Sequence, residues 1–252
     1  MCRLLQALSL TLALALVSIF AASCGSSDAR VRFVQAIQDA SALDIDVSNP
    51  NFTPTQEFTN IPFLGVQPNQ PGYTSVPSGS DTLTGSLTGT TTQVFNTTVG
   101  WAGGQQYTVI ATGFSKTGTN GSNVVILSIP DSIPAPPTND VSFRVIDASP
   151  SGPGTVDVYI ELNPNTGPGL PITIQGLAYT QASNYVSFEF NPNNEPTPPG
   201  YTVYVCASGS MNPIISEPIY PASAGAVRTL VLTDVQGGTS MSSSFLELSD
   251  LD

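Results

Sequence analysis

Apolar and polar residues alternate along several short stretches of the chain. Leu43, Ile45 and Val47 would face one way, and Asp44 and Asp46 the other. This alternation is typical of a strand with one buried face. The stretches with this pattern are residues 43–47, 156–160, 201–206 and 227–233. Turn residues separate them, and no stretch after the first 24 residues has helical periodicity, so the pattern predicts an all-β fold.

The chain repeats itself at a nearly constant offset. Arg32 and Arg144 lie in similar motifs 112 residues apart, and Thr108 and Thr229 lie in similar strands 121 residues apart. A proline-rich stretch, residues 134–139, separates the two copies. We therefore predict a first β-sandwich domain over residues 31–133, a semi-extended linker over 134–139 and a second β-sandwich domain over 140–252.

The N-terminus has the features of a secretory signal. Arg3 precedes a mostly apolar run over residues 4–20, and small residues then lead to Cys24. Small residues that end in cysteine resemble a bacterial lipobox, in which the thiol receives a diacylglycerol. We expect a lipoprotein signal peptide over residues 1–23 and a lipidated tether over 24–30. An ordinary signal peptide and a retained membrane anchor are the alternatives.

Composition excludes several functions. The formal net charge is −12 and only six residues are Lys or Arg, so a groove that binds nucleic acid is not expected. Histidine is absent, which removes Ser-His-Asp and Cys-His catalysis and the commonest metal ligand. After removal of the signal, only Cys24 and Cys206 remain, which leaves no intramolecular disulfide framework. We expect no catalytic residue, metal or cofactor.

Two motifs connect the chain to a known family. RFVQAIQDA at residues 32–40 and RVIDASP at residues 144–150 resemble the opening of the "domain of unknown function 4397". The strands at 43–47 and 156–160 and a turn at Pro199-Gly200 also fit. This resemblance implies tandem immunoglobulin-like sandwiches in a bacterial envelope protein, with no established activity. The family's frequent histidine is replaced by Gln35 and Asp147, so no role can rest on it here.

Two charged pairs recur in both copies: Arg32 with Asp44, and Arg144 with Asp157. We interpret each as an ion pair between neighbouring antiparallel strands, worth about 0.2–1 kcal/mol if exposed. A ligand clamp is the alternative.

The expected function is that of a lipid-anchored, non-catalytic module for binding, adhesion or scaffolding. Gly25 after Cys24 favours the outer membrane but does not distinguish its periplasmic face from its surface face. Besides the membrane, an envelope protein or glycan is a candidate partner. Trp101 and Tyr107 flank a turn and are expected in the core, or else could stack on a sugar ring. The alternatives are an extracytoplasmic carbohydrate-active hydrolase that uses carboxylates, and a purely structural envelope component.

Overall fold

The computed structural model describes residues 28–116, 123–133, 135, 138–162, 167–190, 200–221 and 223–251, apart from the side chains of 52–56. These residues form seventeen strands and no helix, which confirms the prediction of an all-β fold. It follows that no helix in this part of the chain could cross a membrane. The expected signal peptide and Cys24 lie outside the described residues, as do Pro134, Pro136 and Pro137 of the expected linker.

The first half of the chain, residues 29–131, contains nine strands in two sheets. They are β1 (Ala29–Ile37), β2 (Ala42–Asn49), β3 (Phe52–Pro62), β4 (Val66–Gln67), β5 (Thr74–Val76), β6 (Gly79–Leu87), β7 (Gln93–Trp101), β8 (Gln106–Phe114) and β9 (Asn123–Pro130). Sheet A has the order β4-β1-β8-β9, with β5 also paired to β1. Sheet B has the order β3-β2-β6-β7. Strands β1 and β8 are parallel.

The second half, residues 140–251, contains eight strands in two further sheets. They are β10 (Asp140–Asp147), β11 (Thr155–Leu162), β12 (Ile174–Ala178), β13 (Val186–Glu189), β14 (Tyr201–Ala207), β15 (Pro213–Ile219), β16 (Val227–Asp234) and β17 (Met241–Leu251). Sheet C has the order β13-β10-β16-β17, and sheet D has the order β12-β11-β14-β15. Strands β10 and β16 are parallel, like β1 and β8 in the first half.

Each half is sandwich-like because its two sheets enclose one apolar core. In the first half, Leu43, Ile45 and Val47 of β2 point into the core that sheets A and B share, as the alternation predicts. Trp101 is also buried there. In the second half, Phe143 of β10 packs against Tyr201 of β14 with ring centroids 5.5 Å apart. Burying such side chains is the main favourable contribution to folding.

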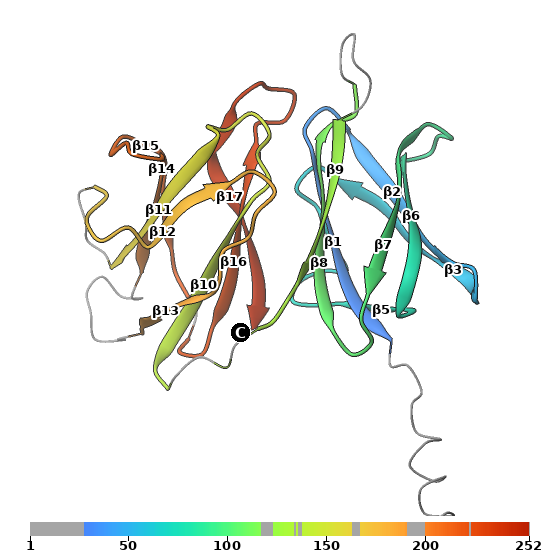
Figure 1. The fold of residues 1–252 in the computed structure, drawn as a ribbon, viewed down its shortest axis with the longest axis horizontal. Helices are drawn as coiled ribbons and strands as arrows, with labels where there is room; N and C mark the ends of the chain where they lie inside the picture. The colour runs from blue at the N-terminus through green and yellow to red at the C-terminus, as the bar shows by residue number, and fades with distance from the viewer. Residues whose placement is uncertain are drawn as a thin grey trace, which may run out of the picture.

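The inner sheets of the two halves pack face to face, so the four sheets stack in the order B, A, C, D (Figure 1). Their shared apolar cluster consists of Val34, Ala36, Ile110, Leu127, Ile146, Ala148, Val231 and Leu248. This packing corrects one expectation. Residues 227–233 had the pattern of a half-buried strand, but every residue of β16 is buried. Sheet C covers the core of its own half on one face and sheet A on the other.

Candidate functional site at the contact between the halves

Four charged side chains lie buried where sheet A meets sheet C. Arg32 of β1 forms an ion pair with Asp250 at the end of β17. Arg144 of β10 forms an ion pair with Asp131, which directly follows β9. Each arginine is thus paired with the carboxylate of the other half. No side chain of the four is more than 3% exposed, and Arg32 also lies 3.8 Å from Asp131.

The remaining contacts of the two guanidinium groups match one another. The Nε of Arg32 donates to the Thr108 hydroxyl at 2.9 Å, and the Nε of Arg144 donates to the Thr229 hydroxyl at 2.7 Å. One terminal nitrogen of each arginine donates to a main-chain carbonyl of the opposite half. These carbonyls belong to Ser249, at 2.9 Å, and Pro130, at 3.3 Å. The network therefore has approximate twofold symmetry.

Two tyrosines complete the network. Tyr73 donates its hydroxyl proton to Asp131 at 2.8 Å, and Tyr185 donates to Asp250 at 3.0 Å. The Arg32 guanidinium lies 5.0 Å from the centre of the Tyr73 ring, and Arg144 lies 4.9 Å from that of Tyr185. Burial and the neighbouring carboxylates raise the pKa of both tyrosines, so both hydroxyls remain protonated donors.

The charges of these four residues cancel, and most of their polar atoms are satisfied. Burial opposes the charging of Arg144 more strongly than any single neighbour favours it. The attraction of Asp131, together with smaller contributions from Tyr185 and Asp250 and the hydrogen bond to Asp131, nevertheless holds the arginine's pKa above its ordinary value. Each carboxylate also accepts a threonine hydroxyl, from Thr108 at 2.7 Å and Thr229 at 2.5 Å. Buried polar networks whose hydrogen bonds are satisfied in this way make the surrounding structure rigid. The network therefore fixes the relative position of the two inner sheets.

The predicted ion pairs of Arg32 with Asp44 and of Arg144 with Asp157 are wrong. Strands β1 and β2 belong to different sheets, and so do β10 and β11, so the paired residues are not neighbours. The sequence pattern identified the two arginines correctly but assigned them the wrong carboxylates.

Asp44 and Asp157 instead hold loops. Asp44 accepts hydrogen bonds from the main chain of Asn60, at 2.7 Å, and from the Thr88 hydroxyl, at 2.8 Å, and the first of these contributes most to lowering its pKa. Burial would raise the pKa of Asp157, but hydrogen bonds from the main chain of Gly209 and Gly176 and from a serine hydroxyl together lower it.

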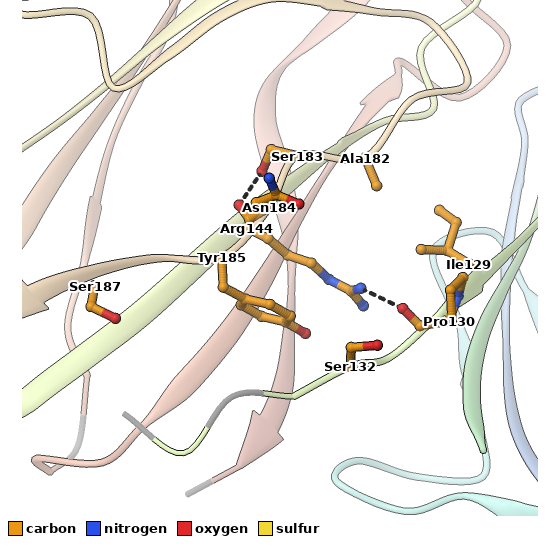
Figure 2. Close-up of a pocket in the computed structure, with 9 residues that line it drawn as sticks. All are labelled: Ile129, Pro130, Ser132, Arg144, Ala182, Ser183, Asn184, Tyr185 and Ser187. Atoms are coloured by element: carbon orange, nitrogen blue, oxygen red, sulfur yellow. Dashed lines mark hydrogen bonds between the residues drawn. The ribbon is translucent and has the colours of Figure 1, made fainter. Parts of the chain in front are cut away.

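A cavity of about 530 Å³ opens beside Arg144, between the end of β9 and the segment that leads into β13 (Figure 2). The Arg144 side chain crosses this space toward the carbonyl of Pro130, and the Tyr185 ring lies alongside it. The other lining residues are mostly small and polar: Ile129, Ser132, Ala182, Ser183, Asn184 and Ser187. This cavity is the part of the network that a ligand could reach.

The corresponding place beside Arg32 is filled by the chain itself. In the first half, six residues separate Val66, which pairs with β1, from Tyr73. In the second half, only two residues separate Ala182, which bridges to β10, from Tyr185. The longer loop brings Gln70 onto β17, and the shorter loop leaves the cavity open.

Gln70 uses its carboxamide to bind the edge of the opposite half. Its oxygen accepts from the main-chain N–H of Ser249 at 2.6 Å, and its nitrogen donates to the carbonyl of Glu247 at 3.4 Å. Pro130 takes the place of Ser249 on the open side and has no N–H to offer. A side chain like that of Gln70 would therefore lack one of its two partners in the cavity.

A second buried acidic site lies at the end of sheet C. Asp147 and Asp234 are at most 1% exposed, and each has one carboxylate oxygen without a partner in the part of the chain described. Ser149 joins them, because its N–H donates to Asp147 at 3.0 Å and its hydroxyl donates to Asp234. Burial raises the pKa of Asp147 to about 6, against the hydrogen bond from Ser149. Gln35 occupies the matching position of β1.

Sequence reasoning missed Asp131, Asp250, Tyr73 and Tyr185. A repeat signal existed for each pair, because the aspartates are 119 residues apart and the tyrosines 112 residues apart. Neither pair lies inside a recognisable motif. The stacking of sheet A on sheet C brings the aspartates to the arginines, and the pairing of β5 with β1 and of β13 with β10 brings the tyrosines to them. Within the described residues, no three His, Cys, Asp or Glu side chains are grouped as metal ligands would be.

Cys206 and Trp101 are both core residues. Cys206 is fully buried beside Tyr159 and Tyr204, and burial raises the pKa of its thiol. Trp101 is 3% exposed and donates its indole N–H to the Ser128 hydroxyl at 3.1 Å. Stacking of a sugar on Trp101 would require exposure that this indole does not have.

The distant likenesses found among solved structures include the following two. One is described as "The Bacillus anthracis TIE protein", with 8% identity, 82% of this chain and 34% of that chain covered, and a TM-score of 0.26. The other is described as "a putative adhesin from Bacteroides ovatus", with 10% identity, 90% of this chain and all of that chain covered, and a TM-score of 0.21. The chain thus spans about a third of the length of the TIE protein.

No curated protein matches the chain. One family model matches residues 29–159, which are more than half of the 252 residues, and the match begins at β1 and runs into β11. The chain therefore belongs to the family described as "Domain of unknown function (DUF4397)".

Proposed function

We propose that this protein is a lipid-anchored component of the bacterial cell envelope, built from two tandem immunoglobulin-like domains that act as one rigid, non-catalytic binding, adhesion or scaffolding unit. The observation that carries the proposal is the buried network between the halves. An interface with exchanged ion pairs and an apolar cluster holds two sandwiches in one orientation, whereas tandem domains on a free linker would move independently.

The support for two copies comes from matching strand arrangements. The inner sheets run β4-β1-β8-β9 and β13-β10-β16-β17, and the outer sheets run β3-β2-β6-β7 and β12-β11-β14-β15. The central parallel pair has the same register in both, since Arg32 lies opposite Thr108 and Arg144 lies opposite Thr229. The support for an anchor is the lipobox-like sequence that ends at Cys24.

A rigid body on a lipid tether is suited to presenting loops at a fixed distance from a membrane. Loops lie at the two ends of each sandwich, where binding residues of such folds commonly gather. The expected location is the outer membrane, and the expected partner is an envelope protein or glycan. No catalytic residues are proposed.

Fractionation of the natural host with and without a Cys24→Ala substitution tests the anchor. We expect the unaltered protein in the membrane fraction with a diacylglycerol on Cys24 by mass spectrometry, and the variant released. An unmodified Cys24 still preceded by Ser23 in the mature protein would refute the anchor. Specific capture of an envelope protein or glycan by the intact protein would support binding over a purely structural role.

A further inference from the structure

The cavity beside Arg144 differs from its counterpart in a way that indicates a ligand site. Both arginines occupy the same kind of place, with the same threonine, carboxylate and tyrosine partners. Around Arg32 the six-residue loop closes the surface with Gln70, and around Arg144 the two-residue loop leaves about 530 Å³ open. That volume lies within the range of about 300–1,000 Å³ typical of small-molecule sites.

The lining offers hydrogen-bonding groups that the protein does not use itself. The side chains of Ser132 and Asn184 make no hydrogen bond to the described part of the chain and line the cavity. A serine hydroxyl and an asparagine amide can each donate and accept. Ile129, Ala182 and the ring of Tyr185 add apolar surface.

The charge of the site is already balanced. Arg144 is the only charged residue in the lining, and its guanidinium is paired with Asp131. An anion would have to compete with that buried carboxylate, and a cation would find no unpaired carboxylate in the lining. The surroundings therefore favour a neutral ligand.

We propose that this cavity binds a neutral, hydroxylated ligand of the size of one or two sugar units, with Ser132 and Asn184 as its hydrogen-bonding partners and Tyr185 as its apolar wall. Such a ligand carries many groups that both donate and accept, which matches hydroxyl and amide partners. This inference rests on the proposed role as a binding module and names the ligand class for it.

The test is a titration of the purified full chain with glucose, galactose, mannose and N-acetylglucosamine, followed by ligand-observed NMR. We expect saturable, millimolar binding of at least one sugar. Asn184→Ala should weaken it roughly tenfold, as expected for the loss of one hydrogen bond to the ligand. Replacing residues 183–184 with the six-residue loop of 67–72 should abolish it. Asn96→Ala, which removes an exposed amide from β7 of the outer sheet, is the matched control and should leave binding unchanged.

Three results would overturn the proposal. The first is no saturable binding of any sugar in the panel, and the second is a sugar affinity in Asn184→Ala and in the loop replacement equal to that of the unaltered protein. The third is preferential binding of acetate or tetramethylammonium, used as charged probes. Unchanged urea midpoints in both variants would show that a loss of binding is local. A lipidated protein that captures an envelope partner but binds no sugar would refute the cavity and leave the proposed function standing. Sugar binding by a protein whose Cys24 is unmodified in the natural host would refute the lipid anchor and leave the cavity proposal standing.

Discussion

The substitution Arg144→Met tests whether the buried network holds the two halves together. Methionine has a long apolar side chain that can occupy the same space, so the change removes the charge and the hydrogen bonds with little loss of volume. It breaks the ion pair to Asp131, the 2.7 Å bond to Thr229 and the 3.3 Å bond to the carbonyl of Pro130. Asp131 then remains buried without its main counter-charge.

The expected loss of stability follows from the partners that remain. Removing one member of a buried ion pair typically costs about 3–5 kcal/mol, because the other charge stays desolvated. Asp131 keeps hydrogen bonds from Thr108 and Tyr73, and Arg32 lies 3.8 Å away. These contacts place the expected loss near the lower end, at about 3 kcal/mol. That is a large part of the roughly 5–15 kcal/mol by which domains are usually stable.

Urea unfolding followed by two signals measures both the loss of stability and the coupling between the two halves. Trp101 is the only tryptophan and lies in the core of the first half, so its fluorescence reports that half alone. Far-ultraviolet circular dichroism reports the strands of both halves. In the unaltered protein the two curves should coincide, because the halves unfold together. In Arg144→Met the curves should separate, with the fluorescence and dichroism midpoints no longer equal.

The control is Asp46→Asn on the outer sheet, for which we expect a change within about 0.5 kcal/mol. A loss below about 1 kcal/mol in Arg144→Met would mean that the network behaves like an exposed pair and does not join the halves. Coincident curves in Arg144→Met would also contradict the reasoning, since they would show that the apolar cluster alone couples the two cores.

Further substitutions test other parts of the structure. The raised pKa of Asp147, about 6 against 3.8, means that the folded state binds its proton more tightly, so this group's contribution to stability falls as pH rises from about 4 to 6. Asp147→Asn should therefore stabilise the protein by up to roughly 3 kcal/mol at pH 7 and by little at pH 4, measured by urea unfolding at both values. Gly113→Ala should destabilise by at least about 2 kcal/mol, because φ is +104° and a Cβ would lie 2.1 Å from the carbonyl oxygen of Asn123; a thermal melt with no shift would contradict this. Ile110→Ala should cost about 2–5 kcal/mol in the apolar cluster between the halves, and an unchanged urea midpoint would show that the two sheets do not pack there. The Cys206 thiol should react with a maleimide only on unfolding, and rapid labelling of the native protein would show that it is accessible.

The sequence predicted the positions of the strands better than it predicted which of their faces are buried and which residues they contact. Alternation in β2 identified the buried face correctly, because one side of sheet B meets the core and the other does not. The same rule failed for β16, since a strand between two packed sheets is buried on both faces regardless of its polar residues. It also failed for β11 of the outer sheet D, where Asp157 and Tyr159 are buried although the alternation predicts that they face outward. Arg32 in β1 looked like an exposed residue that needed a nearby carboxylate. Its real partner, Asp250, is 218 residues away and could be found only from the contact between halves.

The two halves share the buried charged network that holds them together, and they differ in the residues and loops next to it. The arginine, threonine, carboxylate and tyrosine of the network are the same on both sides, and each half supplies the carboxylate that pairs with the arginine of the other. The differences lie just outside it: Gln35 against Asp147, and a closed loop against an open cavity. The loop cannot be held beside Arg144 as it is beside Arg32, because Pro130 offers no N–H where Ser249 does, and the space there stays open to a ligand. The open side is therefore where a ligand of this protein should be sought first.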